Sequence, residues 1–143
     1  RMNSQALLAD VSATQDPEDG YNFYVEKDGL RYAGTHLLID LNGASRLNEL
    51  ETVEDALRRA VSATGATLLD INLHHFTPQG GISGVAILAE SHMSIHTWPE
   101  TQFAAVDLFL CGRCDAYQAI PILKEVFQPD RVQVTEHKRG LVI

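Results

Sequence analysis

Two apolar segments near the middle of the chain constrain the fold more than any other feature. ISGVAILAE (82–90) and QFAAVDLFL (102–110) are short, rich in β-formers, and apolar on both faces of an extended chain. A strand of this kind is covered on two sides. The predicted helices form only one covering layer, so further chain or a partner subunit must cover the second face of the sheet.

Two helices are predicted from the spacing of apolar residues. The first has one apolar face, formed by residues three and four positions apart: Val53, Ala56, Leu57, Ala60 and Val61. Thr52, with Asp55 three residues later, is its predicted N-cap, and Gly65 is its predicted C-terminal stop. The second helix is predicted over residues 115–127, where Pro121 marks either a late start or a kink.

The remaining regular segments read as strands. They are YNFYV (21–25), a short edge strand, THLLIDL (35–41), ATLLDINLHHF (66–76) and RVQVTEH (131–137). From residue 35 the order is strand, helix, three strands, helix, strand. It predicts an α+β two-layer sandwich, with a mostly antiparallel β-sheet and two helices packed on one face. Residues 1–29 are expected to form a flexible N-terminal arm, and residues 30–143 one domain.

Composition narrows the classes of partner. The net charge of -8 argues against a nucleic-acid backbone as the main partner. No apolar run approaches the ~18 residues that cross a bilayer, and the first residues lack the basic-then-apolar pattern of a secretory leader. We therefore expect a cytoplasmic protein that binds neither nucleic acid nor membrane.

Polar residues beside the strands suggest several chemistries. Four histidines lie there: His74, His75, His92 and His96. On one strand His92 and His96 would share a face but lie ~13 Å apart, too far for one ion, and no H-E-x-x-H pattern is present. We predict no metal. Ser91 lacks the flanking glycines of a hydrolase nucleophile elbow, which disfavours a hydrolase. The alternative without a catalytic role is a serine at the end of a strand, beside partly buried histidines.

The two cysteines, Cys111 and Cys114, form the motif CGRC. A C-x-x-C pair is typical of a redox centre or of half a zinc site. Neither a second C-x-x-C nor an H-x-x-x-H follows it, which disfavours zinc. The motif lies between a predicted strand and a predicted helix, which is typical of redox pairs. Two alternatives therefore stay open: a redox pair, or two cysteines without a shared role.

The segment GISGVAILAESHMSIHTWPE (81–100), followed by AAVDLFLCG (104–112), resembles the bacterial S-adenosylmethionine decarboxylase proenzyme family, whose members depend on a pyruvoyl group. The resemblance extends through GTHLLIDLNGAS (34–45) and LHHFTPQGG (73–81), and on to EHKRG (136–140). Many near-contiguous matches in the right order are far more specific than one short motif. The first 29 residues lie outside the resemblance.

The resemblance implies that the chain cleaves itself between Glu90 and Ser91, into a β chain of residues 1–90 and an α chain of residues 91–143. The Ser91 hydroxyl would attack the Glu90 carbonyl, and elimination would leave a covalent pyruvoyl group at position 91. His96 matches the proton acceptor of this processing, and Ser83 matches a serine that assists it. In a regular strand Ser91 and His96 point to opposite faces. His96 can serve Ser91 only if the chain bends between them or two strands come back together.

The family further implies an enzyme that decarboxylates S-adenosylmethionine and supplies spermidine synthesis. A pyruvoyl carbonyl would condense with the substrate amine and accept electrons as CO₂ leaves. Cys111 matches the proton donor, whereas Cys114 has no assigned role. Phe76, Trp98 and Glu100 resemble the substrate pocket, with core packing as the alternative for the two aromatic residues. The implied homodimer of cleaved protomers would cover the second face of the sheet.

Two other functions remain as alternatives. One is a pyruvoyl-dependent arginine or ornithine decarboxylase of the same family, and the other is a non-processing regulatory homologue. The intact HTWPE (96–100) favours the nucleoside substrate, although Phe103 stands where many relatives carry Tyr. The presence of Ser91, His96 and Cys111 together argues against a homologue that has lost processing.

Overall fold

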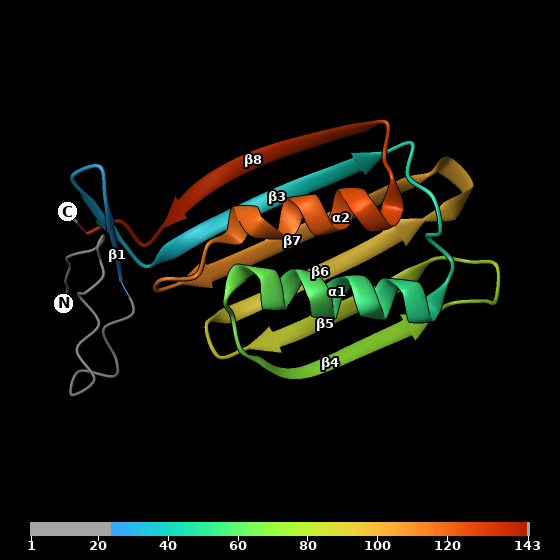
Figure 1. Cartoon of the computed structure of the whole chain (residues 1–143), viewed down its shortest axis with the longest axis horizontal. Coiled ribbons are helices and arrows are strands. Elements are labelled where there is room, and N and C mark those ends of the chain that lie inside the picture. Colours follow the sequence, from blue (N-terminus) through green and yellow to red (C-terminus); the bar gives the residue numbers. More distant parts are fainter. Residues whose placement is uncertain (1–23, 143) are drawn as a thin grey trace.

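The computed structural model describes residues 24–142. Its main sheet is antiparallel and has two helices on one of its faces (Figure 1). The sheet has the order β4-β5-β6-β7-β3-β8, and all its neighbouring strands are antiparallel. Its strands are β3 (Gly34–Asn42), β4 (Leu68–His75), β5 (Ile82–Leu88), β6 (Ser91–Trp98), β7 (Phe103–Cys111) and β8 (Arg131–Arg139). The predicted α+β two-layer sandwich is confirmed.

Helix α1 (Leu50–Thr64) has the predicted apolar face, which is fully buried against the sheet. Gly65 ends the helix with a left-handed φ of 85°, as predicted. The predicted N-cap is wrong, because Glu49 occupies the N-cap position, without a capping hydrogen bond from its side chain, and Thr52 lies inside the first turn. The Thr52 hydroxyl instead donates to the Glu49 carboxylate at 2.8 Å.

The second predicted helix divides into two elements. A 3₁₀ turn, η3 (Ala116–Gln118), precedes α2 (Ala119–Phe127). The Asp115 carboxylate caps the turn by accepting the Tyr117 backbone N–H at 3.1 Å. Pro121 lies in the first turn of α2, where its missing N–H has no helical partner to lose. Pro121 therefore marks a late start and not a kink.

Strand β6 was not predicted as a separate element, so the expected five-stranded sheet is wrong by one strand. Ala89 and Glu90 form a two-residue turn between β5 and β6, and neither has the positive φ of a common hairpin turn. Met93, Ile95 and Thr97 alternate inward along β6. The polar residues between them face the other side of the sheet. The turn was not predicted because it lacks the Asn-Gly sequence of a common hairpin.

A separate two-stranded sheet precedes the main one. It consists of β1 (Val25–Lys27) and β2 (Leu30–Tyr32). The edge strand predicted over 21–25 meets the structure only at its end, because residues 1–23 lie outside the described residues. Most of the predicted N-terminal arm therefore also lies outside them, and the expected boundary at residue 30 falls within this hairpin.

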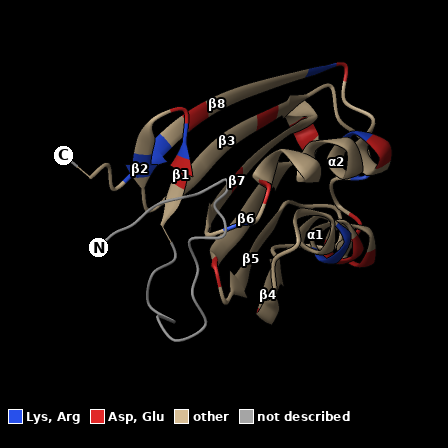
Figure 2. Ribbon diagram, turned by 60° about the vertical axis from the view of Figure 1, so that its left-hand side comes forward, with Lys and Arg blue, Asp and Glu red and all other residues tan. Residues whose placement is uncertain are grey.

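The core lies between the sheet and the helices, and the opposite face of the sheet carries no layer from the described residues. Figure 2 shows α1 and α2 together on one side of the strands. On the other side Leu38, Val85 and Ile87 are 43%, 38% and 49% exposed. The helices therefore cover one face of the sheet and leave the other uncovered, as expected. No helix in residues 24–142 has the length and apolar character to cross a membrane.

Candidate active site

Ser91 has the most unusual backbone near the predicted cleavage point. It begins β6 directly after the Ala89–Glu90 turn, and its φ is 139°. L-residues rarely adopt this region, and holding one there costs on the order of 1–3 kcal/mol. Strain of this kind persists only where the surrounding structure enforces it, and it is concentrated at functional sites.

The direction of the strain matters for chemistry. Viewed along the N–Cα bond of an L-residue, Cβ lies about 120° from the residue's own carbonyl carbon. A φ of 139° therefore brings Cβ of Ser91 to within about 20° of eclipsing the Glu90 carbonyl carbon. At an ordinary strand φ near −120°, Cβ would be turned far from that carbon. The observed conformation suits closure of the five-membered ring that forms when Oγ attacks the preceding carbonyl.

The Glu90 carbonyl is itself held in place. Its oxygen accepts the backbone N–H of Cys111 at 3.0 Å. An N–H donor at this oxygen stabilises negative charge that develops there during nucleophilic attack. The strand order produces this contact, because β6 and β7 are neighbours and Ser91 pairs with Leu110.

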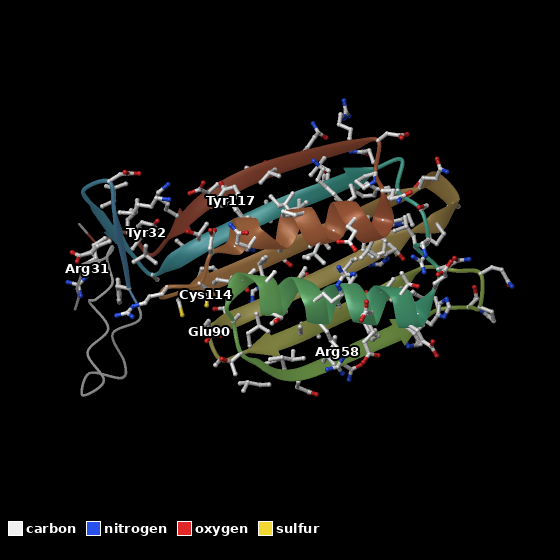
Figure 3. The ribbon with its side chains drawn as sticks, viewed as in Figure 1. Arg31, Tyr32, Arg58, Glu90, Cys114 and Tyr117 are labelled. Carbon is white, nitrogen blue, oxygen red and sulfur yellow. The ribbon has the colours of Figure 1, made fainter. Side chains whose placement is uncertain are left out.

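Both cysteines lie close to this turn. Burial, and secondly the Glu90 carboxylate, raise the pKa of the Cys111 thiol to about 11. Burial, Glu90 and Cys111 raise the pKa of Cys114 to about 12, and Figure 3 shows Glu90 and Cys114 at the same end of the sheet. Both are free thiols. Reactive redox pairs have a lowered thiol pKa, so these environments suit a thiol that retains its proton and argue against the redox alternative.

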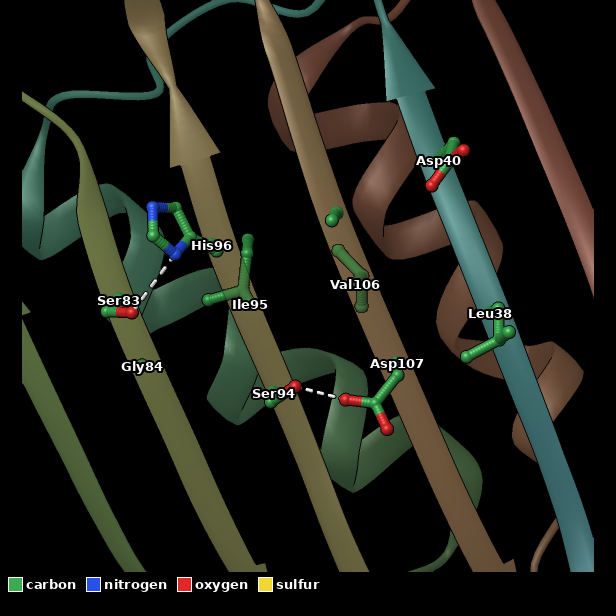
Figure 4. Close-up of a pocket in the computed structure, with 10 residues that line it drawn as sticks. Leu38, Asp40, Ser83, Gly84, Ser94, Ile95, His96, Val106 and Asp107 are labelled. Atoms are coloured by element: carbon green, nitrogen blue, oxygen red, sulfur yellow. Dashed lines mark hydrogen bonds between the residues drawn. The ribbon is translucent and has the colours of Figure 1, made fainter.

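His96 lies within a second group of predicted residues. Its Nδ1 is 3.3 Å from the Ser83 hydroxyl on β5, as Figure 4 shows. The His96 ring stacks on Trp98 with centroids 4.1 Å apart and on Phe76 with centroids 6.0 Å apart. Phe76 is 55% exposed, which excludes core packing for it. Phe103 supports the other side of Trp98 at 5.2 Å, which is a packing role for the residue that replaces Tyr.

Glu100 lies just beyond this aromatic group. It belongs to the short 3₁₀ helix η2 (Pro99–Thr101), which follows Trp98 directly, and its side chain is exposed. The structure thus brings together Ser83, His96, Phe76 and Trp98, with Glu100 beside them. A polar and aromatic surface of this kind can stack on a flat ring and accept hydrogen bonds from hydroxyls.

The two groups of predicted residues lie apart within one chain. Strand β6 pairs without interruption from Ser91 to Trp98, so it has no bend that would bring His96 to Ser91, which was one of the two conditions that the resemblance implied. Five residues of strand separate Ser91 from His96, which is about 16 Å at ~3.3 Å per residue. The structure therefore joins Ser91 to Glu90 and Cys111, and joins His96 to Ser83, but does not join the two sets.

A polar network in the middle of the open face was not predicted from the sequence. His36 Nε2 and His92 Nε2 lie 2.7 and 3.1 Å from the same Asp107 oxygen, and the Ser94 hydroxyl donates to the other oxygen. Burial raises the pKa of Asp107, but these hydrogen bonds outweigh it and leave the pKa below its ordinary value. A carboxylate inside the apolar run AAVDLFL was the signal available in the sequence.

This network also has the composition of a metal site among the described residues, with ligand atoms of His36, His92 and Asp107 within 4.8 Å of one another. The guanidinium of Arg139 lies 3.0 Å from Nδ1 of His36. A guanidinium only donates, so Nδ1 accepts and the ring proton lies on Nε2, facing Asp107. That tautomer favours a hydrogen-bond network over a metal centre.

Comparison with known proteins places this geometry in a family. The family model for S-adenosylmethionine decarboxylase matches residues 35–140. An S-adenosylmethionine decarboxylase proenzyme from Thermomicrobium roseum is 45% identical over 80% of this chain and 99% of its own length. One from Methanococcus vannielii is 44% identical over 79% of this chain and 94% of its own. The crystal structure of the adenosylmethionine decarboxylase from Aquifex aeolicus VF5 superposes with a TM-score of 0.71 at 36% identity, over 78% of this chain and 94% of that one.

The fold, the turn at Ser91 and these matches together define an enzyme of the decarboxylase class. The chain belongs to the S-adenosylmethionine decarboxylase family.

Proposed function

We propose that this chain cleaves itself at the Glu90–Ser91 bond and then decarboxylates S-adenosylmethionine with a pyruvoyl group formed from Ser91. The observation that carries the proposal is the Ser91 backbone, whose φ of 139° turns Cβ toward the Glu90 carbonyl carbon. The matched relatives are named proenzymes, which supports a processing step.

The cleavage chemistry uses only the residues of the turn, a base and water. Oγ of Ser91 bonds to the Glu90 carbonyl carbon, the peptide C–N bond breaks, and an ester with a free Ser91 amine results. A base then removes the Ser91 α-proton, and the new C-terminal carboxylate of Glu90 leaves by β-elimination. The dehydroalanine that remains tautomerises to an imine, which water hydrolyses to the pyruvoyl group with release of ammonia. The Cys111 N–H at the Glu90 oxygen stabilises the charge of the first step.

The base comes from a second copy of the chain. His96 of the same subunit is about five strand residues from Ser91, beyond the reach of proton transfer. The uncovered sheet face, with its exposed apolar side chains, is suited to pairing with an identical face. In an antiparallel two-fold pair, the Ser91 end of one sheet faces the His96 end of the other. Each active site of the proposed homodimer then combines Ser91 and Cys111 with His96 and Ser83 of the partner subunit.

Cys111 protonates the product of decarboxylation. A pyruvoyl carbonyl at position 91 supplies an electron sink when CO₂ leaves the bound amino acid. The raised pKa of Cys111 keeps its thiol protonated through neutral pH, so a proton is ready for delivery to the substrate α-carbon. The cysteine lies at the end of β7, and its backbone contacts Glu90 directly.

Phe76, Trp98 and Glu100 bind the nucleoside part of the substrate. The exposed Phe76 ring and the stacked Trp98 ring offer faces for adenine and for the sulfonium cation. Exposed Glu100 offers acceptor oxygens for ribose hydroxyls. The decarboxylated product carries the aminopropyl group that spermidine synthesis consumes.

The test combines mass and activity on one purified sample. Intact mass spectrometry is expected to show chains 1–90 and 91–143, with the second lacking a free N-terminal amine. CO₂ release is then measured from S-adenosylmethionine, arginine and ornithine in one buffer. Loss of an adenine stack and of buried polar contacts, roughly 1–3 kcal/mol each, predicts at least tens-fold preference for S-adenosylmethionine. A preference for arginine or ornithine would contradict the pocket assignment.

A further inference from the structure

The turn that precedes the strained Ser91 is hydrogen-bonded to a residue that the reaction does not use. Thr67 lies just before β4, and three hydrogen bonds join it to the Ala89–Glu90 turn. Its N–H donates to Oε1 of Glu90 at 2.8 Å, and its hydroxyl donates to Oε2 at 3.2 Å. Its carbonyl accepts the Ala89 N–H at 3.0 Å. We refer to the two bonds to the carboxylate as the Thr67–Glu90 clamp.

The clamp completes a set of constraints on one torsion angle. Ser91 is paired on both sides in the sheet, with Leu88 and with Leu110. On the other side of its N–Cα bond, the Glu90 carbonyl is held by Cys111 and the Glu90 side chain by Thr67. Both ends of the N–Cα bond are therefore tied to neighbouring strands. If the clamp opened, only the Cys111 N–H would hold Glu90, and a turn of Glu90 toward negative φ at Ser91 would swing Cβ away from the carbonyl carbon.

We propose that Thr67 is a positioning residue for self-cleavage, because its hold on the Glu90 carboxylate keeps Ser91 in the conformation from which the hydroxyl attacks. The inference rests on the proposed self-cleavage. Thr67 donates the same two hydrogen bonds before and after attack and exchanges no proton with the reacting atoms. Its contribution is orientation, which governs how often the hydroxyl meets the carbonyl in a productive geometry.

The test follows newly synthesised chain in a cell-free system as it converts to chains 1–90 and 91–143. Thr67→Val keeps the side-chain shape but removes the hydroxyl donor, and is expected to slow conversion about fivefold, because a solvent-exposed hydrogen bond to a carboxylate contributes less than a buried one. Thr67→Ser keeps the donor and is expected to convert near the normal rate. Glu90→Gln should slow conversion by a similar factor. The double variant with Thr67→Val should be no slower than the slower single variant, because both substitutions weaken the Thr67–Glu90 clamp.

A matched control separates positioning from folding. The Thr52 hydroxyl donates to Glu49 at 2.8 Å on the outer surface of α1, so Thr52→Val removes a contact of the same kind away from the turn. Thr52→Val is expected to leave conversion unchanged. To compare stability, each substitution is combined with Ser91→Ala, which prevents processing. The melting temperatures of these double variants show whether Thr67→Val and Thr52→Val affect stability equally.

The first step is isolated in a His96→Ala background, in which removal of the α-proton is expected to stall. Hydroxylamine cleaves an ester to a Glu90 hydroxamate and a chain that starts with a free Ser91 amine. Thr67→Val should slow this cleavage by the same factor as it slows full processing. If Thr67→Val converts at the normal rate while the unsubstituted chain converts and Ser91→Ala does not, the positioning role is wrong and self-cleavage stands. If the unsubstituted chain never converts, the proposed function fails instead.

Discussion

At the scale of single residues, the proposed reaction depends on where Ser91 and Cys111 hold their reactive atoms. Ser91 faces a carbonyl whose oxygen is already hydrogen-bonded, and Cys111 carries a thiol that burial keeps protonated. Both properties come from neighbours in space and not from the residue types alone. Substitutions that change one atom or one charge therefore test these properties.

Ser91→Ala should remain a single chain of full length, because no hydroxyl is left to attack Glu90. A denaturing gel and intact mass are sufficient to check this. The substitution places an L-residue at the same φ of 139°, so the strain is kept and only the nucleophile is lost. Two bands of normal intensity from this variant would rule out the serine chemistry.

Cys111→Ser, once processed, should decarboxylate at least about a hundredfold more slowly, since a serine hydroxyl is a far poorer acid. Cys114→Ser should remain close to the unsubstituted enzyme. The rate of CO₂ release per pyruvoyl group, counted by mass, checks both. An equal loss in the two variants would return the C-x-x-C motif to consideration as a joint redox or metal unit.

The raised pKa of Cys111 predicts its reaction with iodoacetamide. In a Cys114→Ser background, alkylation should be slow at pH 8 and rise about tenfold per pH unit until pH approaches 11, because only the thiolate reacts. Glu90→Gln removes a charge that raises this pKa, so alkylation at pH 8 should become faster. A rate that levels off near pH 9 would show an unperturbed thiol.

At the scale of elements, α1 packs against the sheet and contacts β4 and α2. Leu57 is fully buried at the centre of its apolar face, and Leu50 at the start of the helix is 37% exposed. Leu57→Ala should lower the free energy of unfolding by about 2–5 kcal/mol through the cavity that it leaves. Leu50→Ala, the matched control on the same helix, should cost well under 1 kcal/mol. Urea unfolding of the two variants measures the difference.

At the scale of the whole molecule, one chain separates the residues that the proposed reaction combines. The Ser91 and Cys111 group and the Ser83 and His96 group lie at different positions along β6, and the sheet face that carries His96 is open. The proposed homodimer, which joins these faces, would cover exposed outward side chains such as Ile87, which is 49% exposed.

Complementation tests this arrangement. Ser91→Ala and His96→Ala chains should each stay uncleaved alone. Co-expressed, they should form mixed dimers with one complete site, which contains Ser91 of the His96→Ala chain and His96 of the Ser91→Ala chain. Only the His96→Ala chain should then be cleaved, and chains with different tags make this visible on one gel. Absence of cleavage in purified mixed dimers would contradict a site shared between subunits.

The sequence alone determined the parts of this protein that depend on short windows. The apolar face of α1, its Gly65 stop and most strands follow from local periodicity, and the family follows from contiguous motifs around Ser91. The prediction of a second cover for the sheet came from the same local pattern, because residues such as Val85 and Ile87 are apolar on the outward face of β5.

Only the tertiary structure decided how the turn at Ser91 is held. Ser91 has a φ of 139° and pairs with Leu110, and Glu90 before it accepts hydrogen bonds from the distant residues Thr67 and Cys111. These contacts follow from strand order, in which β6 lies between β5 and β7, and no window of sequence contains them. The separation of His96 from Ser91 has the same origin, since it requires β6 to be straight, and its straightness is imposed by the neighbours that pair with it along its whole length.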